Sequence, residues 1–319
     1  MKTNILLTAT ARSVCVGLVV LLICAPSGCM SVKSSSTRVT YDADGAVLEV
    51  DNHVLARYRH ESVPYKPYVS ELYSPAGVNV VRDNVPDHLH HHGLMYAVAV
   101  DGVNFWEEQK QPGLQKNQGV NDVVRIVDNP LAAVRQRLNW MKSPDDEVLL
   151  EEDREVSVQL MEPRGAALLT WKTKLAVPPG KETATLSGSH YFGLGMRFVE
   201  SMDAVGAFSN ADNKPGRIFR GHERLVESDW CAYAAEADGK PVTVAMFGDP
   251  ANTRHPTTWF TMAKPFAYLS ATLNLHEEPL QIASGRPLNL RYGVAVWDGH
   301  VGNQAIESLY QTWLKKASK

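Results

Sequence analysis

Four of the eleven histidines in this 319-residue chain lie within five positions of the stretch Arg82–Gly93, "RDNVPDHLHHHG". Imidazoles titrate near neutral pH and are common metal ligands, so this density indicates a site for proton transfer or for a metal ion. In an extended segment, His88, His90 and His92 would share one face, whereas His91 would lie on the other. Side chains spaced in this way could hold one divalent metal ion.

A loop that binds a ligand without a metal is the second interpretation, and we favour it. Pro86 and the polar residues around it are typical of a loop, in which histidines would hydrogen-bond a ligand's hydroxyl or carboxylate groups. Asp87 suits both interpretations, as a metal ligand or as a contact to the substrate. Arg82 and Arg197 support the second, because a planar guanidinium binds a carboxylate or vicinal oxygens with two hydrogen bonds.

Two further segments could contribute an acid and a base. "SHYFGLGMRF" (Ser189–Phe198) places His190 beside glycines, which would let a ligand approach the backbone closely. "LHEEP" (Leu275–Pro279) offers Glu277 and Glu278 as candidate bases, although paired glutamates on a surface are usually only solvated. Glu107 and Glu108 of "FWEEQ" are candidate bases for the same reason, and glutamates of this kind are again usually only solvated.

The segment "DPANTRHPTTWF" (Asp249–Phe260) is bounded by prolines and combines Asn252, Arg254, His255 and Trp259. An indole ring stacks on the apolar face of a sugar, while amide and guanidinium groups hydrogen-bond its hydroxyls. We therefore expect this loop to bind a saccharide.

The elements that must position these residues are strands. "AVLEVDNHVLARYR" and "LMYAVAVDGVNFW" each alternate around a two-residue turn, Asp51-Asn52 and Asp101-Gly102, which predicts two hairpins. "LAAVRQRLNWM", "EVLLEEDREVSVQL" and "AALLTWKTKLAV" predict three long strands. Only the tail after residue 303, "NQAIESLYQTWLKK", has helical periodicity. An all-β antiparallel sandwich with a C-terminal helix is the expected fold.

The first residues predict export. Lys2 and Arg12 precede and flank an apolar run, Ser13–Ala25, that is shorter than the roughly 20 residues of a membrane-spanning helix. Ser27-Gly28-Cys29 resembles a lipoprotein processing box, in which Cys29 would carry the lipid anchor. We expect a signal peptide at 1–28, a flexible tether at 29–40 and one β-sandwich domain at 41–319.

Composition sets limits on the function. The chain is 44% hydrophobic and 21% charged, which is ordinary for a globular protein. Cleavage after residue 28 would remove two lysine or arginine residues and change the net charge from −3 to −5. An acidic protein of this kind lacks the charge signature of nucleic-acid binding. Of four cysteines, two lie in the expected signal and a third is the expected lipidation site, so no disulfide framework is expected.

"SPAGVNVVRDNVPDHLHHHGLMYAVAVDGVNFW", "GLGMRF", "DPANTRHPTTWF" and "LNLRYGVAVWDG" together resemble a bacterial family of unknown function whose members are commonly labelled methane oxygenase PmoA. The resemblance covers about Tyr65 to Gly299. Subunits of particulate methane monooxygenase cross the membrane several times, whereas this chain has one removable apolar segment. Members of the family resemble proteins encoded among polysaccharide-degradation genes, which implies carbohydrate chemistry.

The order of several motifs is also similar to galactose-mutarotase-like sandwiches. Such proteins carry an Asn/Arg pair, a His-Gly turn, a tryptophan, an "HxYFNL"-type segment and a late glutamate. Asn79 with Arg82, His92-Gly93, Trp106, "HYFGL" with His190, and Glu277 follow this order here, although "HYFGL" is one residue short. The resemblance implies a large antiparallel β-supersandwich with His190 as acid and a glutamate as base.

These arguments lead to one main hypothesis: an exported carbohydrate-active enzyme that uses His/Glu acid–base chemistry as an epimerase, lyase or hydrolase. The alternatives are a non-catalytic glycan-binding lipoprotein and a metalloenzyme built on His88, His90 and His92. The expected catalytic residues are His90, His92, His190 and Glu277. The expected substrate contacts are Asn79, Arg82, Asp87, His88, His91, Arg197, Asn252, Arg254, His255 and Trp259.

Overall fold

Two-residue turns set the register of the hairpins, as the sequence predicts. Asp51 and Asn52 have φ values of 51° and 63°, and they join β2 (Gly45–Val50) to β3 (His53–Arg59). Asp101 and Gly102, with φ of 48° and 81°, likewise join β6 (Ala99–Val100) to β7 (Val103–Asn104). Positive φ at both positions gives the turn a twist that matches the strands. This computed structural model describes residues 36–86, 88–125, 130–161 and 165–317.

The strands form three antiparallel sheets. The largest sheet has ten strands, in the spatial order β1 (Thr37–Tyr41), β2, β3, β4 (Tyr68–Leu72), β5 (Leu94–Ala97), β13 (Gly193–Arg197), β20 (Tyr268–Thr272), β19 (Thr257–Met262), β16 (Glu223–Ser228) and β15 (Arg217–Arg220). Because β1 pairs with β2, the sheet already begins at Thr37, inside the segment that was expected to be a flexible tether.

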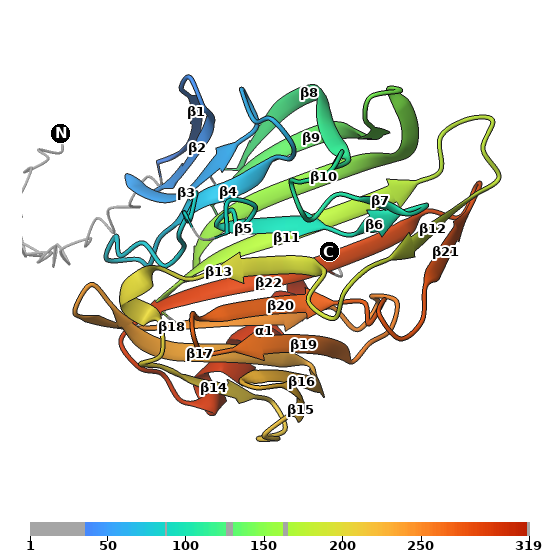
Figure 1. Cartoon of the computed structure of the whole chain (residues 1–319). Coiled ribbons are helices and arrows are strands. Elements are labelled where there is room, and N and C mark those ends of the chain that lie inside the picture. Colours follow the sequence, from blue (N-terminus) through green and yellow to red (C-terminus); the bar gives the residue numbers. More distant parts are fainter. Residues whose placement is uncertain (1–35, 87, 126–129, 162–164, 318–319) are drawn as a thin grey trace, which may run out of the picture. The chain divides into compact units, whose positions relative to one another are not determined.

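A second sheet of eight strands lies behind the first in Figure 1. It contains β14 (Ala207–Asn210), β17 (Trp230–Ala237), β18 (Lys240–Gly248), β22 (Leu288–Asp298), β11 (Ala166–Ala176), β10 (Glu147–Met161), β9 (Leu131–Lys142) and β8 (Leu114–Arg125). The three long strands predicted from the sequence are β9, β10 and β11. A small sheet orders β21 (Leu280–Ala283), β12 (Thr183–Ser187), β6 and β7, and a short 3₁₀ turn spans Glu200–Met202.

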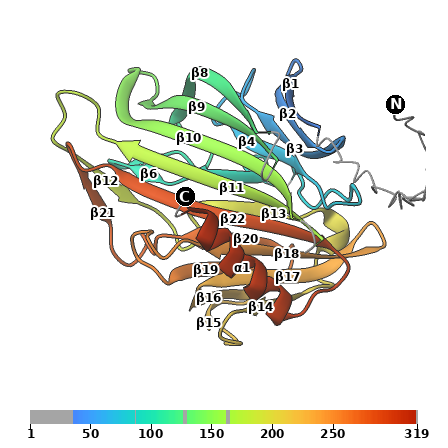
Figure 2. The same cartoon turned by 180° about the vertical axis from the view of Figure 1, so that it is seen from behind.

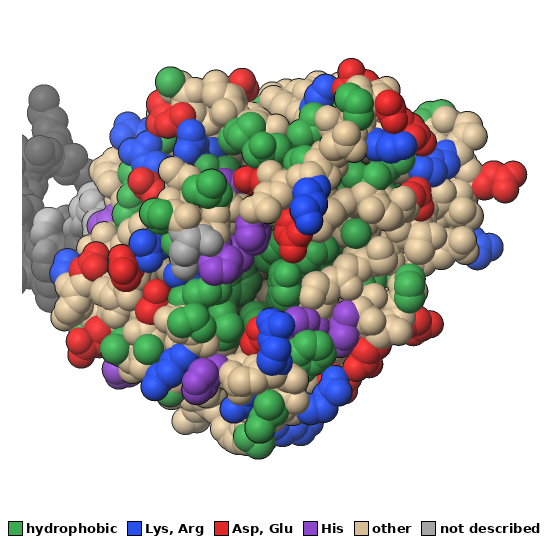
Figure 3. Space-filling view, in the orientation of Figure 1, with side chains coloured by type: hydrophobic (Ala, Val, Ile, Leu, Met, Phe, Trp, Pro, Cys, Tyr) green, Lys and Arg blue, Asp and Glu red, His purple; other side chains and the backbone are tan. Residues whose placement is uncertain are grey.

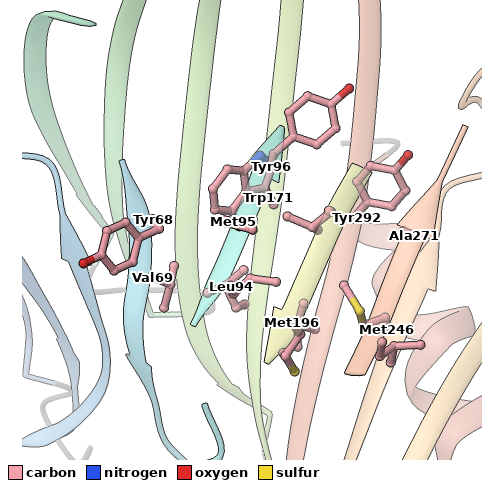
Figure 4. Packing of buried hydrophobic residues seen from close by; sticks show 14 of the residues in the cluster. Tyr68, Val69, Leu94, Met95, Tyr96, Trp171, Met196, Met246, Ala271 and Tyr292 are labelled. Carbon is pink, nitrogen blue, oxygen red and sulfur yellow. The ribbon is translucent and has the colours of Figure 1, made fainter. Parts of the chain in front are cut away.

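The main hydrophobic core fills the space between the two large sheets. Figure 4 shows side chains from β4, β5, β13 and β20 facing those from β11, β18 and β22. Trp171 and Tyr292 from the eight-stranded sheet meet Leu94 and Met196 from the ten-stranded sheet, and all four are fully buried. Alternation along each strand leaves the other face of the ten-stranded sheet open to carry polar and aromatic side chains.

The predicted C-terminal helix is α1 (Asn303–Ala317), and it covers the outer face of the eight-stranded sheet (Figure 2). Its apolar side chains Ile306, Leu309 and Trp313 form a second core with Trp230 and Phe247. The all-β sandwich with a C-terminal helix is therefore confirmed. Within the described ranges, no helix is both long and apolar enough to cross a membrane.

Candidate functional site

A cavity of about 260 Å³ opens on the exposed face of the ten-stranded sheet. Figure 3 shows the hollow with hydrophobic side chains at its floor and histidines on two sides. The floor comes from β19, β20 and the turn before β20, while the walls come from four separate segments of the chain. The lining residues are His88, His90, His91, Glu107, Tyr191, Arg220, Glu223, Phe260, Met262, Phe266 and Tyr268.

The histidine motif forms one wall as a turn, not as a strand. The backbone N–H of His91 donates to the carbonyl of His88 at 2.8 Å. The rings of His88 and His91 are stacked with their centroids 4.6 Å apart, and His90 meets His91 edge-on. The extended arrangement, with His88, His90 and His92 on one face, is therefore wrong. Three of the four expected histidines nevertheless line the same cavity.

His90 and His91 of this wall are held in their neutral form. Burial lowers the pKa of His90 to about 4, and the nearby Lys66 ammonium and His88 add to the effect. Burial lowers the pKa of His91 further, to about 2, with contributions from His90, His88 and Arg197. A neutral imidazole offers one donor and one acceptor, so this wall can hydrogen-bond hydroxyl groups at neutral pH.

His92 lies behind this wall and does not line the cavity. Its Nδ1 is 2.9 Å from Oδ1 of Asp83, and its Nε2 is 2.8 Å from Oε1 of Glu108. The Tyr68 ring stacks on it at 4.3 Å. Burial disfavours the imidazolium, but the hydrogen bonds to Asp83 and Glu108 outweigh burial and raise the pKa of His92. Because both ring nitrogens are occupied, His92 supports the turn and has no nitrogen left for a substrate.

Glu108 is shared between His92 and a buried lysine. The Lys66 side chain is only 1% exposed, and its ammonium donates to Oε1 of Glu108. Burial lowers the pKa of Lys66, and the Glu108 carboxylate counteracts this. Two cations around one buried carboxylate form a closed network. Glu108 is therefore a structural partner, unlike the solvated surface glutamate that the "FWEEQ" stretch indicated.

The opposite wall holds a histidine–carboxylate pair. Nε2 of His190 lies 3.1 Å from Oε2 of Glu223, and Nδ1 lies 3.1 Å from the Ser189 hydroxyl. Arg220 donates to Oε1 of Glu223 at 2.7 Å. Burial lowers the pKa of His190, although the hydrogen bond to Glu223 opposes the change. The His190 ring is buried and stacks on Phe219, with centroids 3.8 Å apart, and neither residue is among those that line the cavity.

A glycine allows the aromatic floor to form. Gly195 lies in β13, and the space that its side chain would occupy is filled by Trp106 and by the Tyr268 hydroxyl. A Cβ atom at this position would lie 2.3 Å from that hydroxyl oxygen and 2.6 Å from Cη2 of Trp106. Trp106 stacks on Phe192, with centroids 5.1 Å apart, and supports the cavity from below.

Glu277 lies outside the cavity lining, which corrects its expected role as base. Its side chain is 50% exposed and paired with Arg217 at 2.9 Å. Hydrogen bonds from Asn274 and Arg217 lower the pKa of Glu277. The carboxylate that meets His190 is instead Glu223, which the sequence did not single out.

Two expected substrate contacts serve the scaffold. Asn79 accepts hydrogen bonds from the backbone N–H groups of Leu72 and Val81, so its side chain stabilises the local backbone conformation. Arg82 pairs with the exposed Glu200 at 3.2 Å. Neither residue lines the cavity.

Arg197 is buried beside the site. Its guanidinium carbon lies 3.7 Å from the centroid of Phe266, a lining residue, and its Nη2 is 3.4 Å from Asp203. Arg197 therefore holds a cavity side chain in place and does not itself face the ligand space.

The loop expected to bind a saccharide is structural. Trp259 is fully buried between the sheets and donates to the carbonyl of Ser228 at 2.7 Å, so it offers no stacking surface. Arg254 donates to the carbonyls of Leu273 and Glu278, each at 2.7 Å.

The two remaining members of that loop are also engaged elsewhere. The Asn252 amide accepts from and donates to the backbone of Arg291, at 2.8 and 2.9 Å. His255 lies 3.1 Å from the Asp229 carboxylate. The expected convergence of residues 252–259 with the histidine motif is therefore wrong.

The described residues do not form a cluster of three or more His, Cys, Asp or Glu side chains arranged around one metal ion. The stacking of His88 on His91 turns these imidazoles parallel to each other, at an interplanar angle of 15°. His92, the third expected ligand, is held by two carboxylates. The geometry therefore contradicts a metal site on His88, His90 and His92. Asp87 and Cys29 lie outside the described residues.

The sequence of residues 45–311 matches a family described as a family of unknown function, DUF6807. The chain belongs to this family. The expectation of membership in a family of unknown function is confirmed, and the match carries no methane-oxygenase label. A comparison with curated proteins finds no match.

A comparison with solved structures finds partial matches to larger proteins. An α-galactosidase from Lactobacillus brevis has 7% identity and a TM-score of 0.48, covering 88% of this chain and 42% of that one. The GH36 α-galactosidase AgaA from Geobacillus stearothermophilus has 9% identity and a TM-score of 0.42, with coverage of 83% and 40%. A 4-alpha-glucanotransferase from Thermococcus litoralis has 12% identity and a TM-score of 0.33, with the same coverage. This chain spans about two fifths of the length of these proteins.

Proposed function

We propose that this protein is a carbohydrate-active enzyme whose reaction takes place in the cavity between the His88–His91 turn and the His190–Glu223 pair. One observation carries the proposal. Two polar walls that are about a hundred residues apart in the chain meet over one aromatic floor. Buried polar groups that converge on a pocket are typical of a binding or catalytic site.

Glu223 supplies the acid–base group, because its carboxylate lines the cavity, and His190 and Arg220 hold it in place. A carboxylate only accepts hydrogen bonds, so an ionised Glu223 places the hydrogen of a neutral His190 on Nε2. The Glu223 carboxylate can take up one further proton and release it again. Because burial lowers the pKa of His190, its imidazole is neutral near neutral pH and donates to Glu223, whose carboxylate can accept a proton from the substrate.

The other walls suit a neutral, hydroxylated ligand. His90 and His91 are uncharged and can each donate and accept a hydrogen bond. Tyr191 and Phe260 present ring surfaces, on which the apolar face of a sugar ring packs. A cavity of about 260 Å³ is close to the lower limit for ligand pockets, roughly 300 Å³, which favours a single sugar unit.

The reaction is an epimerisation, an elimination or a hydrolysis. Each requires a group that exchanges a proton with a sugar carbon or oxygen, and such groups contribute roughly 10²–10⁴ in rate. We also propose that the protein is exported and lipid-anchored at Cys29. The short apolar run Ser13–Ala25 and the Ser27-Gly28-Cys29 sequence support this part of the proposal.

A panel of mono- and oligosaccharides tests the proposal. Polarimetry detects epimerisation, ultraviolet absorbance detects an unsaturated elimination product, and a reducing-end assay detects hydrolysis. Glu223→Gln and His190→Ala are expected to lower kcat by at least a hundredfold, whereas Glu277→Gln leaves it unchanged. Saccharide binding without turnover would support a glycan-binding protein instead, and equal effects of Glu223→Gln and Glu277→Gln would reject the site.

A further inference from the structure

A second concave surface lies on the opposite sheet. A hollow of about 600 Å³ runs over the outward faces of β8–β11 and β22 and is bounded by the turn after β18. A neighbouring hollow of about 400 Å³ shares Arg137, Asp153 and Lys174 with it, so the two are continuous. We call this combined surface the outer groove. Its strands appear in front in Figure 2.

Charged side chains cross the outer groove in two rows set by the strand register. In the first row, Glu155 of β10 pairs in register with Arg135 of β9 and Lys172 of β11. In the second row, Asp153 is opposite Arg137 and Lys174 in the same way. Adjacent strands are about 4.8 Å apart, so the two cations of each row are separated by about 10 Å.

The surface that these rows present to solvent is cationic. Arg135 and Lys172 both bind Glu155, at 2.7 and 2.9 Å, and their side chains are 61% and 52% exposed, whereas Glu155 is 17% exposed. Each carboxylate of the rows is flanked by two cations. Five outward cations line the outer groove against four outward carboxylates, in a chain whose net charge is −3. Those residues are Arg135, Arg137, Lys172, Lys174 and Arg291 against Glu151, Asp153, Glu155 and Asp249.

Arg137 is the side chain most available to a ligand. Its guanidinium forms no ion pair or hydrogen bond with the residues in the described ranges. Lys174 pairs only weakly, at 3.5 Å from Asp153. Across the register from Arg137 lies Gly119, whose missing side chain leaves room beside the guanidinium. A planar guanidinium with free donors binds carboxylates with two hydrogen bonds.

We propose that the outer groove binds an acidic polysaccharide that carries a carboxylate on alternate sugar units. The groove and the catalytic cavity lie on different sheets, so this binding does not depend on the reaction in the cavity. Cations about 10 Å apart fit widely spaced carboxylates, with the aliphatic stems of lysine and arginine lying against the chain.

The same observations argue against nucleic acid. A strand of nucleic acid carries one phosphate per about 3.4 Å, so its charges would fall on Asp153 and Glu155 as well as on the cations. Proteins that bind single strands also stack bases on aromatic rings, and the residues lining the hollow include no aromatic side chain.

Fluorescence anisotropy with a labelled hyaluronan oligosaccharide tests the proposal on the full chain. The double variant Arg137→Glu/Lys174→Glu removes two cations without disturbing the ion pairs of Glu155. The expected result is at least a tenfold loss of affinity, with an unchanged unfolding midpoint. Asp153→Asn, which removes a repulsive charge, is expected to strengthen binding.

The matched control is Arg286→Glu/Lys240→Glu, which makes the same charge change at two exposed positions outside the groove. This control should bind hyaluronan like the unaltered protein, and neutral dextran should not compete. Absence of hyaluronan binding, equal losses in both double variants, or equally strong competition by single-stranded DNA would each overturn the proposal. Glu223→Gln should retain full hyaluronan affinity, which separates this result from the outcome of the catalytic test.

Discussion

Nε2 of His92 lies 2.8 Å from Oε1 of Glu108, although the two residues are sixteen positions apart in the chain. The contact divides the histidine motif into two parts. His88, His90 and His91 face the ligand space, while His92 anchors the turn through a buried ion pair. The motif is therefore dense because it supplies both a wall and its support.

Removal of either member of this pair should destabilise the fold. His92→Ala leaves Glu108 with Lys66 alone, and Glu108→Gln leaves two buried cations without their shared carboxylate. A buried charge that loses its partner costs about 3–5 kcal/mol of unfolding free energy. Urea unfolding of both single variants and the double variant would measure the coupling. A stable His92→Ala protein that has lost turnover would instead return His92 to the catalytic residues.

Acid should weaken the fold through the cavity histidines. His90 and His91 have folded-state pKa values of about 4 and about 2, below the ordinary value of 6.5. Their contribution to stability is complete above about pH 6.5 and is lost as the pH falls toward the folded values, because only the unfolded chain binds the protons. His91→Gln should flatten the fall in stability measured by thermal unfolding between pH 6.5 and pH 4. An unchanged slope in this variant would contradict the neutral state of His91.

His92 should produce the opposite dependence. Its pKa is raised in the folded state, so its contribution is complete below pH 6.5 and disappears as the pH rises through the folded value. The unfolding free energy of the unaltered protein, compared with that of Glu108→Gln across the alkaline side of pH 6.5, would reveal this loss. If the difference between the two proteins grows with pH, the assigned charge on His92 is wrong.

Gly195→Ala should deform the cavity floor. The new methyl group would meet the Tyr268 hydroxyl and the Trp106 ring at distances far below van der Waals contact. Overpacking of this kind costs about 1–3 kcal/mol. Ligand affinity and unfolding free energy should fall together. Ala97→Gly, a change on the neighbouring strand β5 in the same core region, should lower stability without loss of affinity.

Trp259→Phe should lower the stability of the fold without changing the affinity of the site for its ligand. The change leaves the carbonyl of Ser228 without its indole donor, which costs about 1–3 kcal/mol. Because Trp259 lies between the sheets, saccharide affinity should remain within twofold of the unaltered value in an equilibrium titration. A large loss of affinity at full stability would show that this tryptophan contacts the ligand.

The sequence alone was sufficient for local geometry. Asp51-Asn52 and Asp101-Gly102 predicted their hairpin turns because positive φ at both positions is confined to few residue types. Long runs of alternation predicted β9, β10 and β11, and helical spacing predicted α1. These signals depend only on near neighbours, so they needed no tertiary information.

The site is formed by the pairing of strands that are far apart in the chain, and the sequence did not predict which strands pair. Glu223 reaches His190 because β16, β19, β20 and β13 are adjacent in the sheet, an order that sequence spacing does not give. Trp259 and Arg254 combined the residue types of a sugar site, but strand alternation turned the ring inward and the guanidinium onto loop carbonyls. One available signal was Glu108, a glutamate two residues after buried Trp106 in an aromatic stretch, where a solvated side chain is least expected.

The strand β15 forms one margin of the ten-stranded sheet and has consequences for solubility. All four of its residues are exposed, and arginines occupy both ends, at 217 and 220. If a second copy added itself antiparallel to this margin, Arg217 of one chain would face Arg220 of the other, and like charges would repel. Ile218 and Phe219 therefore remain open to water without inviting aggregation, and concentrated solutions of the protein should stay free of strand-mediated fibres.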